Sequence, residues 1–207
     1  KQTGILRADS VEELIDFALA FADQRVIPGE RIAIITNAGG PGIMASDACE
    51  KSGLKLAQFT RETIDKLRAN LPPTANIYNP VDVVGDASAD RYKVALDAVL
   101  KDPNVDGALI LLTPQASTEV EKTAEVIVSA AAGTDKSVLA SFMGGPAVAK
   151  GIETLTNKGI PNYPFPERAV SCFWAMTRYR RWLEKKPAPV KRFEVNQGKA
   201  RAVLDRA

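Results

Sequence analysis

The sequence predicts an α/β protein built around a parallel, doubly wound sheet. Strand-like apolar runs alternate with helix-like segments from residue 31 to residue 184. RIAIIT (31–36) and GALILLT (107–113) are continuously apolar, which is typical of central parallel strands that are buried on both faces. The chain has 207 residues, of which 45% are hydrophobic and 25% charged, as in an ordinary globular protein with one large domain or with one domain and an appendage.

The first expected element is a helix over residues 10–22. Asp9 or Ser10 is a suitable N-cap, and apolar residues then recur at helical spacing. The apolar face of this helix consists of Val11, Leu14, Ile15, Ala18 and Leu19. Pro28 and Gly29 interrupt the chain before the first strand.

From residue 31 onward, strands and helices alternate. Strands or extended segments are expected at residues 31–36, 55–59, 77–83, 107–113, 137–143 and 160–163. Helices are expected at residues 42–52, 62–70, 88–101, 118–132, 146–158 and 166–184. Right-handed crossovers between parallel strands place helices on both faces of the sheet, so we expect a flavodoxin-like arrangement.

Composition excludes several classes of function. The chain has no histidine, which removes serine–histidine triads, histidine acid–base catalysis and the commonest zinc ligand. Cys49 and Cys172 lie in helix-like segments with apolar neighbours, so we expect free buried thiols and a cytoplasmic setting. No apolar run is long enough to cross a bilayer, and no signal-peptide pattern opens the chain. We therefore predict no metal site and no membrane partner.

Charge is uneven along the chain. Residues 176–207 contain ten Lys or Arg and three acidic residues, a net charge of +7, which leaves −5 on residues 1–175. We interpret RYRRWLEKKPAP as the end of an amphipathic helix that leads into a proline-rich linker. No motif beside it is typical of nucleic-acid recognition, so we predict no nucleic-acid partner.

The segment NAGGPG (37–42) follows the first strand and is the strongest candidate site. Glycine permits positive φ angles and a close approach of the backbone to a ligand. The next helix, expected to begin near Pro41 or Gly42, adds unpaired N–H groups and a partial positive charge. Such a helix start suits phosphate or carboxylate, and Pro41 fits in the first turn because it lacks an N–H group. The alternative is a tight strand-to-helix turn without a ligand.

Three further loops leave the same edge of the expected sheet. They are NPVDVVGD (79–86), TPQAST (113–118) and the shorter MGG (143–145). Ligands of open parallel sheets bind at the carboxyl ends of the strands. Taken singly, the Asn, Asp, Ser and Thr side chains of these loops are equally explained as local caps of backbone amides. Only the loops together favour a binding site.

These motifs in this order resemble those of the NDP-forming acyl-CoA synthetases, relatives of succinyl-CoA synthetase. The likeness rests on TNAGGPG, NPVDVVGDA with RY close behind, LLTPQAST and MGG, and it extends from KQTGILRADSVEEL to RYRRWL. The part matched resembles the ligase-CoA domain, a flavodoxin-like unit. The resemblance implies a helical lead-in from an upstream domain (1–27), the ligase-CoA domain (28–184), and a linker with the start of an ATP-grasp domain (185–207).

The resemblance also implies a reaction, in which acyl-CoA, ADP and phosphate interconvert with organic acid, CoA and ATP through an acyl phosphate and a phosphohistidine. The histidine would lie upstream, so we assign no catalytic residue here and expect the isolated segment to be inactive. CoA, ADP or ATP, magnesium and phosphate would serve the intact enzyme, with no cofactor bound permanently. The expected partners are a small organic acid or acyl phosphate and the CoA-binding and ATP-grasp domains of the same enzyme, in an oligomer.

The resemblance assigns two sets of site residues. The phosphate-binding set is Asn37, Ala38, Gly39, Gly40, Pro41 and Gly42. The substrate-binding set is Asn79, Asp82, Gly85, Thr113, Pro114 and Gln115. Two other functions stay open at this point: the synthetase-like regulatory half of a protein lysine acetyltransferase, and a free-standing flavodoxin-like module that binds a flavin or nucleotide.

Overall fold

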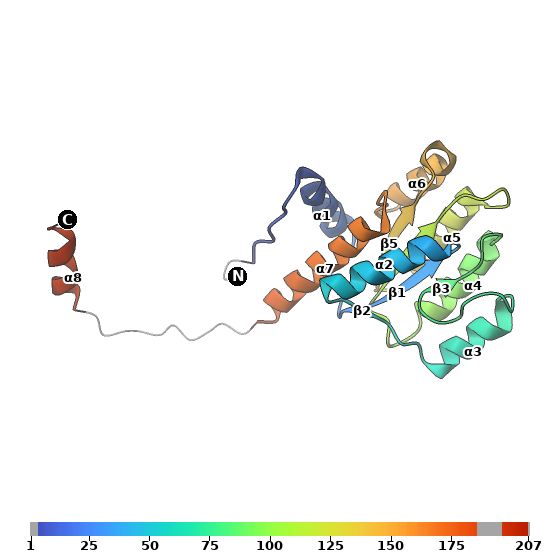
Figure 1. The fold of residues 1–207 in the computed structure, drawn as a ribbon, viewed down its shortest axis with the longest axis horizontal. Helices are drawn as coiled ribbons and strands as arrows, with labels where there is room; N and C mark the ends of the chain where they lie inside the picture. Colours follow the sequence, from blue (N-terminus) through green and yellow to red (C-terminus); the bar gives the residue numbers. More distant parts are fainter. Residues whose placement is uncertain (1–3, 186–195, 207) are drawn as a thin grey trace.

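The computed structural model describes residues 4–185 and 196–206. Its centre is a parallel sheet of five strands (Figure 1). The strands are β1 (Arg31–Thr36), β2 (Lys55–Leu56), β3 (Val81–Asp82), β4 (Gly107–Leu112) and β5 (Ser137–Phe142). The strand order is β2-β1-β4-β5, and β3 also pairs with β1. The chain first adds β2 and β3 on one side of β1 and then β4 and β5 on the other side, so the strand order reverses between β1 and β4. The predicted doubly wound α/β fold is therefore confirmed.

Helices cover both faces of the sheet (Figure 1). One face carries α1 (Val11–Asp23), α2 (Gly39–Ser52) and α7 (Pro166–Leu183). The other face carries α3 (Arg61–Asn70), α4 (Ala89–Val99), α5 (Val120–Ala132) and α6 (Ala149–Thr156), the last preceded by a 3₁₀ turn at Gly145–Val148. A further helix, α8 (Gln197–Leu204), follows residues 186–195, which lie outside the described residues.

The strands build two hydrophobic cores because side chains alternate across a sheet. In β1, Ile32 and Ile34 pack toward α2 and α7, whereas Ala33 and Ile35 pack toward α4. All four side chains are fully buried. The continuous apolar pattern of the central strands thus reflects burial on both faces, as expected from the sequence.

Strands β2 and β3 are shorter than the sequence predicted, because together they occupy one side of β1. β2 pairs with Arg31 and Ile32, and β3 pairs with Ile35 and Thr36. The expected strand at 160–163 is reduced to a single bridge between Ala140 and Asn162, beyond β5. The lengths of these segments were therefore predicted wrongly, although their places in the fold were predicted correctly.

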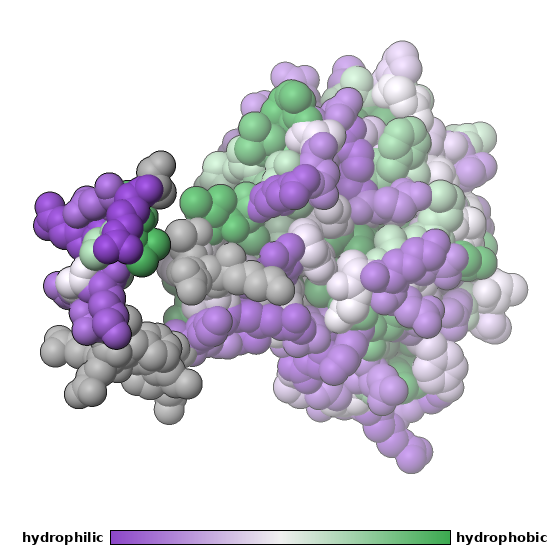
Figure 2. All heavy atoms as spheres, turned by 60° about the vertical axis from the view of Figure 1, so that its left-hand side comes forward, coloured by the Kyte–Doolittle hydropathy of each residue, from purple (hydrophilic) through white to green (hydrophobic). Residues whose placement is uncertain are grey.

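The predicted apolar face of α1 does not face the domain. Leu14 is 60% exposed and Ile15 54% exposed, whereas Phe17 and Ala20 are buried against α7. The helix is held in this orientation by Arg168, which donates two hydrogen bonds to the buried carboxylate of Asp16. Helix α1 therefore has apolar side chains both on its buried side and on its exposed side. The space-filling view shows green hydrophobic side chains among purple polar ones on this side of the molecule (Figure 2).

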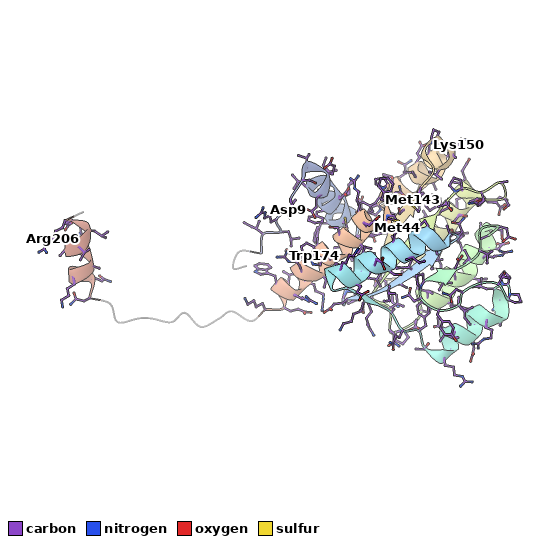
Figure 3. The ribbon with its side chains drawn as sticks, viewed as in Figure 1. Asp9, Met44, Met143, Lys150, Trp174 and Arg206 are labelled. Carbon is purple, nitrogen blue, oxygen red and sulfur yellow. The ribbon has the colours of Figure 1, made fainter. Side chains whose placement is uncertain are left out.

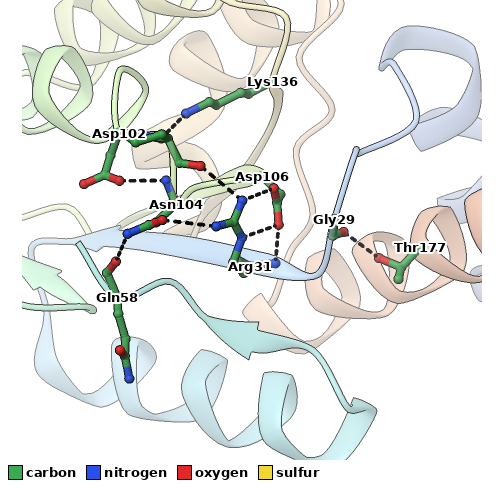
Figure 4. Close-up of polar contacts among 9 residues, drawn as sticks. Gly29, Arg31, Gln58, Asp102, Asn104, Asp106, Lys136 and Thr177 are labelled. Carbon is green, nitrogen blue, oxygen red and sulfur yellow. Dashed lines mark hydrogen bonds and ion pairs between the residues drawn. The ribbon is translucent and has the colours of Figure 1, made fainter. Parts of the chain in front are cut away.

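A polar network lies at the amino ends of the strands, opposite the candidate loops (Figure 4). The Asp106 carboxylate accepts two hydrogen bonds from the Arg31 guanidinium and one from the Arg31 backbone N–H. Arg31 also donates to Asn104 Oδ1, and Asn104 donates to the Gln58 carbonyl. Burial by itself raises the pKa of Asp106, but the bonds and charge of Arg31 outweigh it, and the pKa lies below its usual value.

Within the described residues, no helix combines the length and the apolar composition that a membrane crossing requires.

Candidate functional site

The candidate loops meet at the carboxyl edge of the sheet. A methyl group built on Gly85 would lie 3.8 Å from the Asn37 carbonyl oxygen and 4.0 Å from Gln115 Cγ. A methyl group on Gly39 would lie 3.9 Å from Asp82 Oδ2. The loops that follow β1, β3 and β4 are therefore neighbours, at the point where the strand order reverses.

The loop after β5 joins this cluster through Pro114. A methyl group on Gly144 would lie only 2.5 Å from Pro114 Cγ, so the two segments are in close contact. Gly144 has φ +158°, and the following Gly145 has φ +56°, in the left-handed region that favours glycine. The MGG segment is therefore a turn that packs beside the TPQ segment.

Helix α2 begins inside the glycine-rich segment, at Gly39. The sequence placed this start near Pro41 or Gly42, two to three residues too late. Ala38 is the N-cap and provides no side-chain hydrogen bond. The amides of Gly39 and Gly40 belong to the first turn, where N–H groups have no partner within the helix, and both residues are exposed. Gly39 and Gly40 are therefore exposed residues at the positive end of the helix dipole.

Thr36 shapes this turn, and sequence reasoning missed it. Its hydroxyl accepts a hydrogen bond from the Ala38 N–H (3.0 Å) and donates one to the Ala38 carbonyl (2.8 Å). The Gly42 N–H donates to the same Ala38 carbonyl, at 3.3 Å. A methyl group on Gly42 would lie 3.1 Å from Thr36 Cγ2. The signal that could have identified Thr36 was its polar side chain at the end of β1, after a run of apolar residues.

The side chain of Asn37 links two loops. It is 3% exposed, its Nδ2 donates to the Thr113 carbonyl (2.8 Å), and its Oδ1 accepts from the Thr113 N–H (2.9 Å). The Thr113 hydroxyl also donates to Asn37 Oδ1, at 3.3 Å. Both predicted site residues thus use these groups to fix the loop after β1 against the loop after β4.

The side chain of Asn79 lies within the sheet. Its Oδ1 accepts from the Ile34 N–H (2.9 Å), and its Nδ2 donates to the carbonyls of Ile32 (2.8 Å) and Ala57 (3.1 Å). These bonds fill the gap between β2 and β3 beside β1. The structure therefore places Asn79 as a substitute for missing strand backbone, with its amide turned away from the edge.

Asp82, Gly85 and Gln115 remain at the edge itself. Asp82 Oδ1 accepts the Val84 N–H at 2.9 Å, and its other oxygen faces Gly39. Gln115 is exposed, and only its backbone is engaged locally, with its N–H donating to Thr118 Oγ1. Beneath them, buried Tyr92 donates to the Leu111 carbonyl, and burial together with the charge of Asp82 raises its pKa.

A separate groove of about 550 Å³ lies between α1, α2 and α7, and Met44 and Trp174 are among its lining residues (Figure 3). None of the candidate loops lines it. At the loop edge, by contrast, the start of α2 presents the backbone amides of Gly39 and Gly40, which suit a small anion.

Comparisons with known proteins identify relatives of this chain. Residues 32–187 match the family model described as the ligase-CoA domain. The 4-hydroxybutyrate–CoA ligase (ADP-forming) of Nitrosopumilus maritimus is 38% identical over 99% of this chain. The acetate–CoA ligase (ADP-forming) I of Archaeoglobus fulgidus is 45% identical over 86% of this chain.

A solved structure has the same fold. It is the dinucleotide-forming acetyl-coenzyme A synthetase 1 of Ca. Korarchaeum cryptofilum in complex with phosphate and ADP, with 36% identity, a TM-score of 0.80, and 86% of this chain covered. This chain spans 29% and 25% of the lengths of the two curated relatives and 39% of that solved chain. It therefore corresponds to one part of much longer proteins.

Proposed function

The chain belongs to the ligase-CoA domain family, and on this basis we propose that it is the phosphate-cradling domain of an NDP-forming acyl-CoA synthetase. The intact enzyme would interconvert acyl-CoA, ADP and phosphate with an organic acid, CoA and ATP. The resemblance to this family implies that a phosphorylated histidine carries the phosphoryl group, and that histidine would lie outside this chain, which contains none. The chain by itself would bind the group without completing the reaction.

One observation carries the proposal: the exposed, uncapped amides of Gly39 and Gly40 at the start of α2. Two fixed N–H donors and the positive end of the helix dipole stabilise a negatively charged oxygen without any side chain. No acidic residue lies in the first turn of α2 itself, and the carboxylate that approaches it is that of Asp82, whose Oδ2 lies 3.9 Å from a methyl group built on Gly39. The side chains of Thr36 and Asn37 hold these amides in place.

Fixed donors contribute to catalysis because they need no reorganisation while charge develops. Stabilisation of a transferring phosphoryl group depends mainly on positioning and on such electrostatic contacts. Removal of one comparable donor in other enzymes lowers turnover by roughly 10²–10³-fold. We expect an effect of this order when the Gly40 amide is blocked in the intact enzyme.

The acid or acyl phosphate would lie beside the same amides. We assign its contacts to Asp82, Gly85, Pro114 and Gln115, because these residues surround the edge near Gly39. Asn37, Asn79 and Thr113 would act indirectly, by fixing the loops. CoA, the adenine nucleotide and magnesium would bind to the CoA-binding and ATP-grasp domains of the same cytoplasmic, oligomeric enzyme.

A phosphate titration followed by NMR tests the anion site. We expect inorganic phosphate to shift the amide resonances of Gly39 and Gly40 in a saturable, salt-dependent manner. Gly40→Val should abolish this response and preserve the fold, because no atom lies within 4 Å of a methyl group at this position. Gly198→Val is a matched control, since Gly198 is the second residue of α8 as Gly40 is of α2.

Two results would contradict the proposal. One is a titration in which phosphate moves neither glycine amide. The other is a Gly40→Val variant that binds phosphate as the parent chain does, which would show that the anion lies elsewhere.

A further inference from the structure

Val84 has an unusual backbone conformation. Its φ angle is +73°, and it is the one non-glycine residue with positive φ among residues 4–185 and 196–206. The left-handed region disfavours L-residues, and β-branched side chains most strongly. Such a conformation persists only where the surrounding structure imposes it, and it is enriched at functional sites.

The chain is anchored on both sides of Val84. Val83 and Ala87 are fully buried in the core beneath α4. Between them, residues 84–86 form an arch at the edge of the sheet. The Val84 N–H donates to Asp82 Oδ1, and the Ala87 N–H donates to the Val84 carbonyl at 3.0 Å.

Arg91 connects α4 to both sides of this arch. Its Nη1 donates to the Val83 carbonyl at 3.2 Å and to Asp86 Oδ1, and its Nη2 donates to Asp86 Oδ2 at 3.4 Å. The Arg91 side chain is 26% exposed, so most of it is packed against the protein. The hydrogen bond from Arg91 lowers the pKa of Asp86, which keeps the carboxylate charged.

The arch lies over the candidate site. Gly85 is at its tip, next to the Asn37 carbonyl and the Gln115 side chain. An ordinary surface ion pair contributes little to stability, so stability alone does not account for an arginine that bonds to the residues on both sides of a strained segment at this place. The left-handed Val84 and the bonds of Arg91 on both sides of it together indicate that Arg91 maintains the shape of the arch.

We propose that Arg91 is a positioning residue: by bridging the Val83 carbonyl and the Asp86 carboxylate, it holds Val84 in its left-handed conformation and keeps Gly85 beside the phosphate-binding turn. This inference rests on the proposed function for the role of the site, but the conformational effect can be measured independently of it. Arg91 itself contacts neither phosphate nor substrate in this assignment.

The first test measures the backbone conformation in the 207-residue chain. The Cα and Cβ chemical shifts of Val84 report its φ angle. In Arg91→Met, we expect the extended conformer to become favoured by roughly tenfold, the order by which a non-glycine residue disfavours the left-handed region. Adding Val84→Asn should restore the arch, because Asn tolerates this region better. Lys93→Met, which removes another ion pair of α4, should change neither shift.

The second test uses acetyl phosphate and inorganic phosphate as probes. We expect acetyl phosphate to shift the Gly85 amide in the parent chain, and its affinity to fall at least threefold in Arg91→Met and recover in the double variant. The affinity for inorganic phosphate at Gly39 and Gly40 should stay unchanged in all variants.

The outcomes separate this inference from the proposed function. Unchanged Val84 shifts in Arg91→Met, or no recovery on adding Val84→Asn, would overturn the role of Arg91 even if phosphate binds. Failure of phosphate to bind the parent chain would refute the proposed function, while the Val84 shifts would still decide whether Arg91 holds the arch. Equal loss of both probes in Arg91→Met would also overturn the inference, because it would indicate general disruption.

Discussion

Replacement of Asn79 by Ala should destabilise the protein strongly, although Asn79 lies in a loop. The substitution removes three hydrogen bonds between the side chain and the backbone of the sheet. Ile32 keeps a bond from the Ala57 N–H, but the buried Ile34 N–H and the Ala57 carbonyl lose the partner that the side chain supplied. At about 1 kcal/mol for the lost bond to Ile32 and about 1–3 kcal/mol for each of the two buried groups left unsatisfied, we expect a loss of about 3–7 kcal/mol.

Thermal and urea unfolding followed by circular dichroism measure this effect. For a chain of this size, the expected loss lowers Tm by roughly 6–28 °C. Asn76→Ala is a matched control in the same segment, because Asn76 is exposed and its side chain bonds only to its own loop. We expect it to change stability by about 1 kcal/mol or less.

A charge-changing variant at the same position adds a pH test. In Asn79→Asp, a carboxylate oxygen would face the carbonyls of Ile32 and Ala57, so the folded state should raise the pKa of the new group above its unfolded value. Such a group contributes stability below its unfolded pKa of about 3.9 that is lost as pH rises. The deficit of this variant should therefore be small at pH 4 and larger at pH 7. An Asn79→Ala variant with unchanged stability but impaired ligand binding would refute the reasoning. It would indicate that the Asn79 side chain contacts the ligand instead.

Four other substitutions test three separate parts of the structure. Phe17→Ala should lower the free energy of unfolding in urea by about 3–5 kcal/mol. Leu14→Ala, on the exposed side of the same helix, should change it by less than about 0.5 kcal/mol. A larger loss in Leu14→Ala than in Phe17→Ala would refute the orientation of α1. Asp106→Asn should be less stable than the parent chain at pH 7 but should lose less stability on acidification. The reason is that the lowered pKa of Asp106 contributes stability above the unfolded pKa of this group, and this contribution disappears as pH falls. Parallel pH profiles of stability for the two chains would contradict this. Gly42→Ala should lower stability by about 0–2 kcal/mol, because strain of about 1–3 kcal/mol from a methyl group 3.1 Å from Thr36 Cγ2 is offset by the roughly 1 kcal/mol that Ala gains over Gly in a helix. A clear rise in Tm would show that the turn adjusts without strain.

The α/β class followed from patterns that are local in the sequence. Continuous apolar runs at 31–36 and 107–113 identified the central strands, because burial on both faces leaves no polar position in them. The helices between them were recognised by their spacing and capping residues, and mainly their ends were misplaced. The start of α2 was placed too late because three glycines and a proline are usually read as a loop.

The neighbourhood of the candidate loops also followed from the sequence, since parallel strands bring their carboxyl ends to one edge. The orientation of single side chains did not. The resemblance assigned Asn37 to phosphate binding and Asn79 to substrate binding, yet the side chain of each bonds to backbone 22–76 residues away in the chain. A polar side chain in a sequence shows that it needs a partner, and only the fold decides which partner is near.

The sequence by itself determined the alternation of strands and helices, the burial of the central strands, and the glycine-rich start of a helix at the carboxyl edge of the sheet. These features depend on backbone sterics and on hydrophobic periodicity, which act over a few residues. The tertiary structure alone decided that Asn79 completes the sheet, that Asp16 and Arg168 turn the apolar stripe of α1 outward, and that Val84 adopts a left-handed conformation. These outcomes depend on hydrogen bonds and ion pairs between groups that only folding brings within about 3 Å of each other.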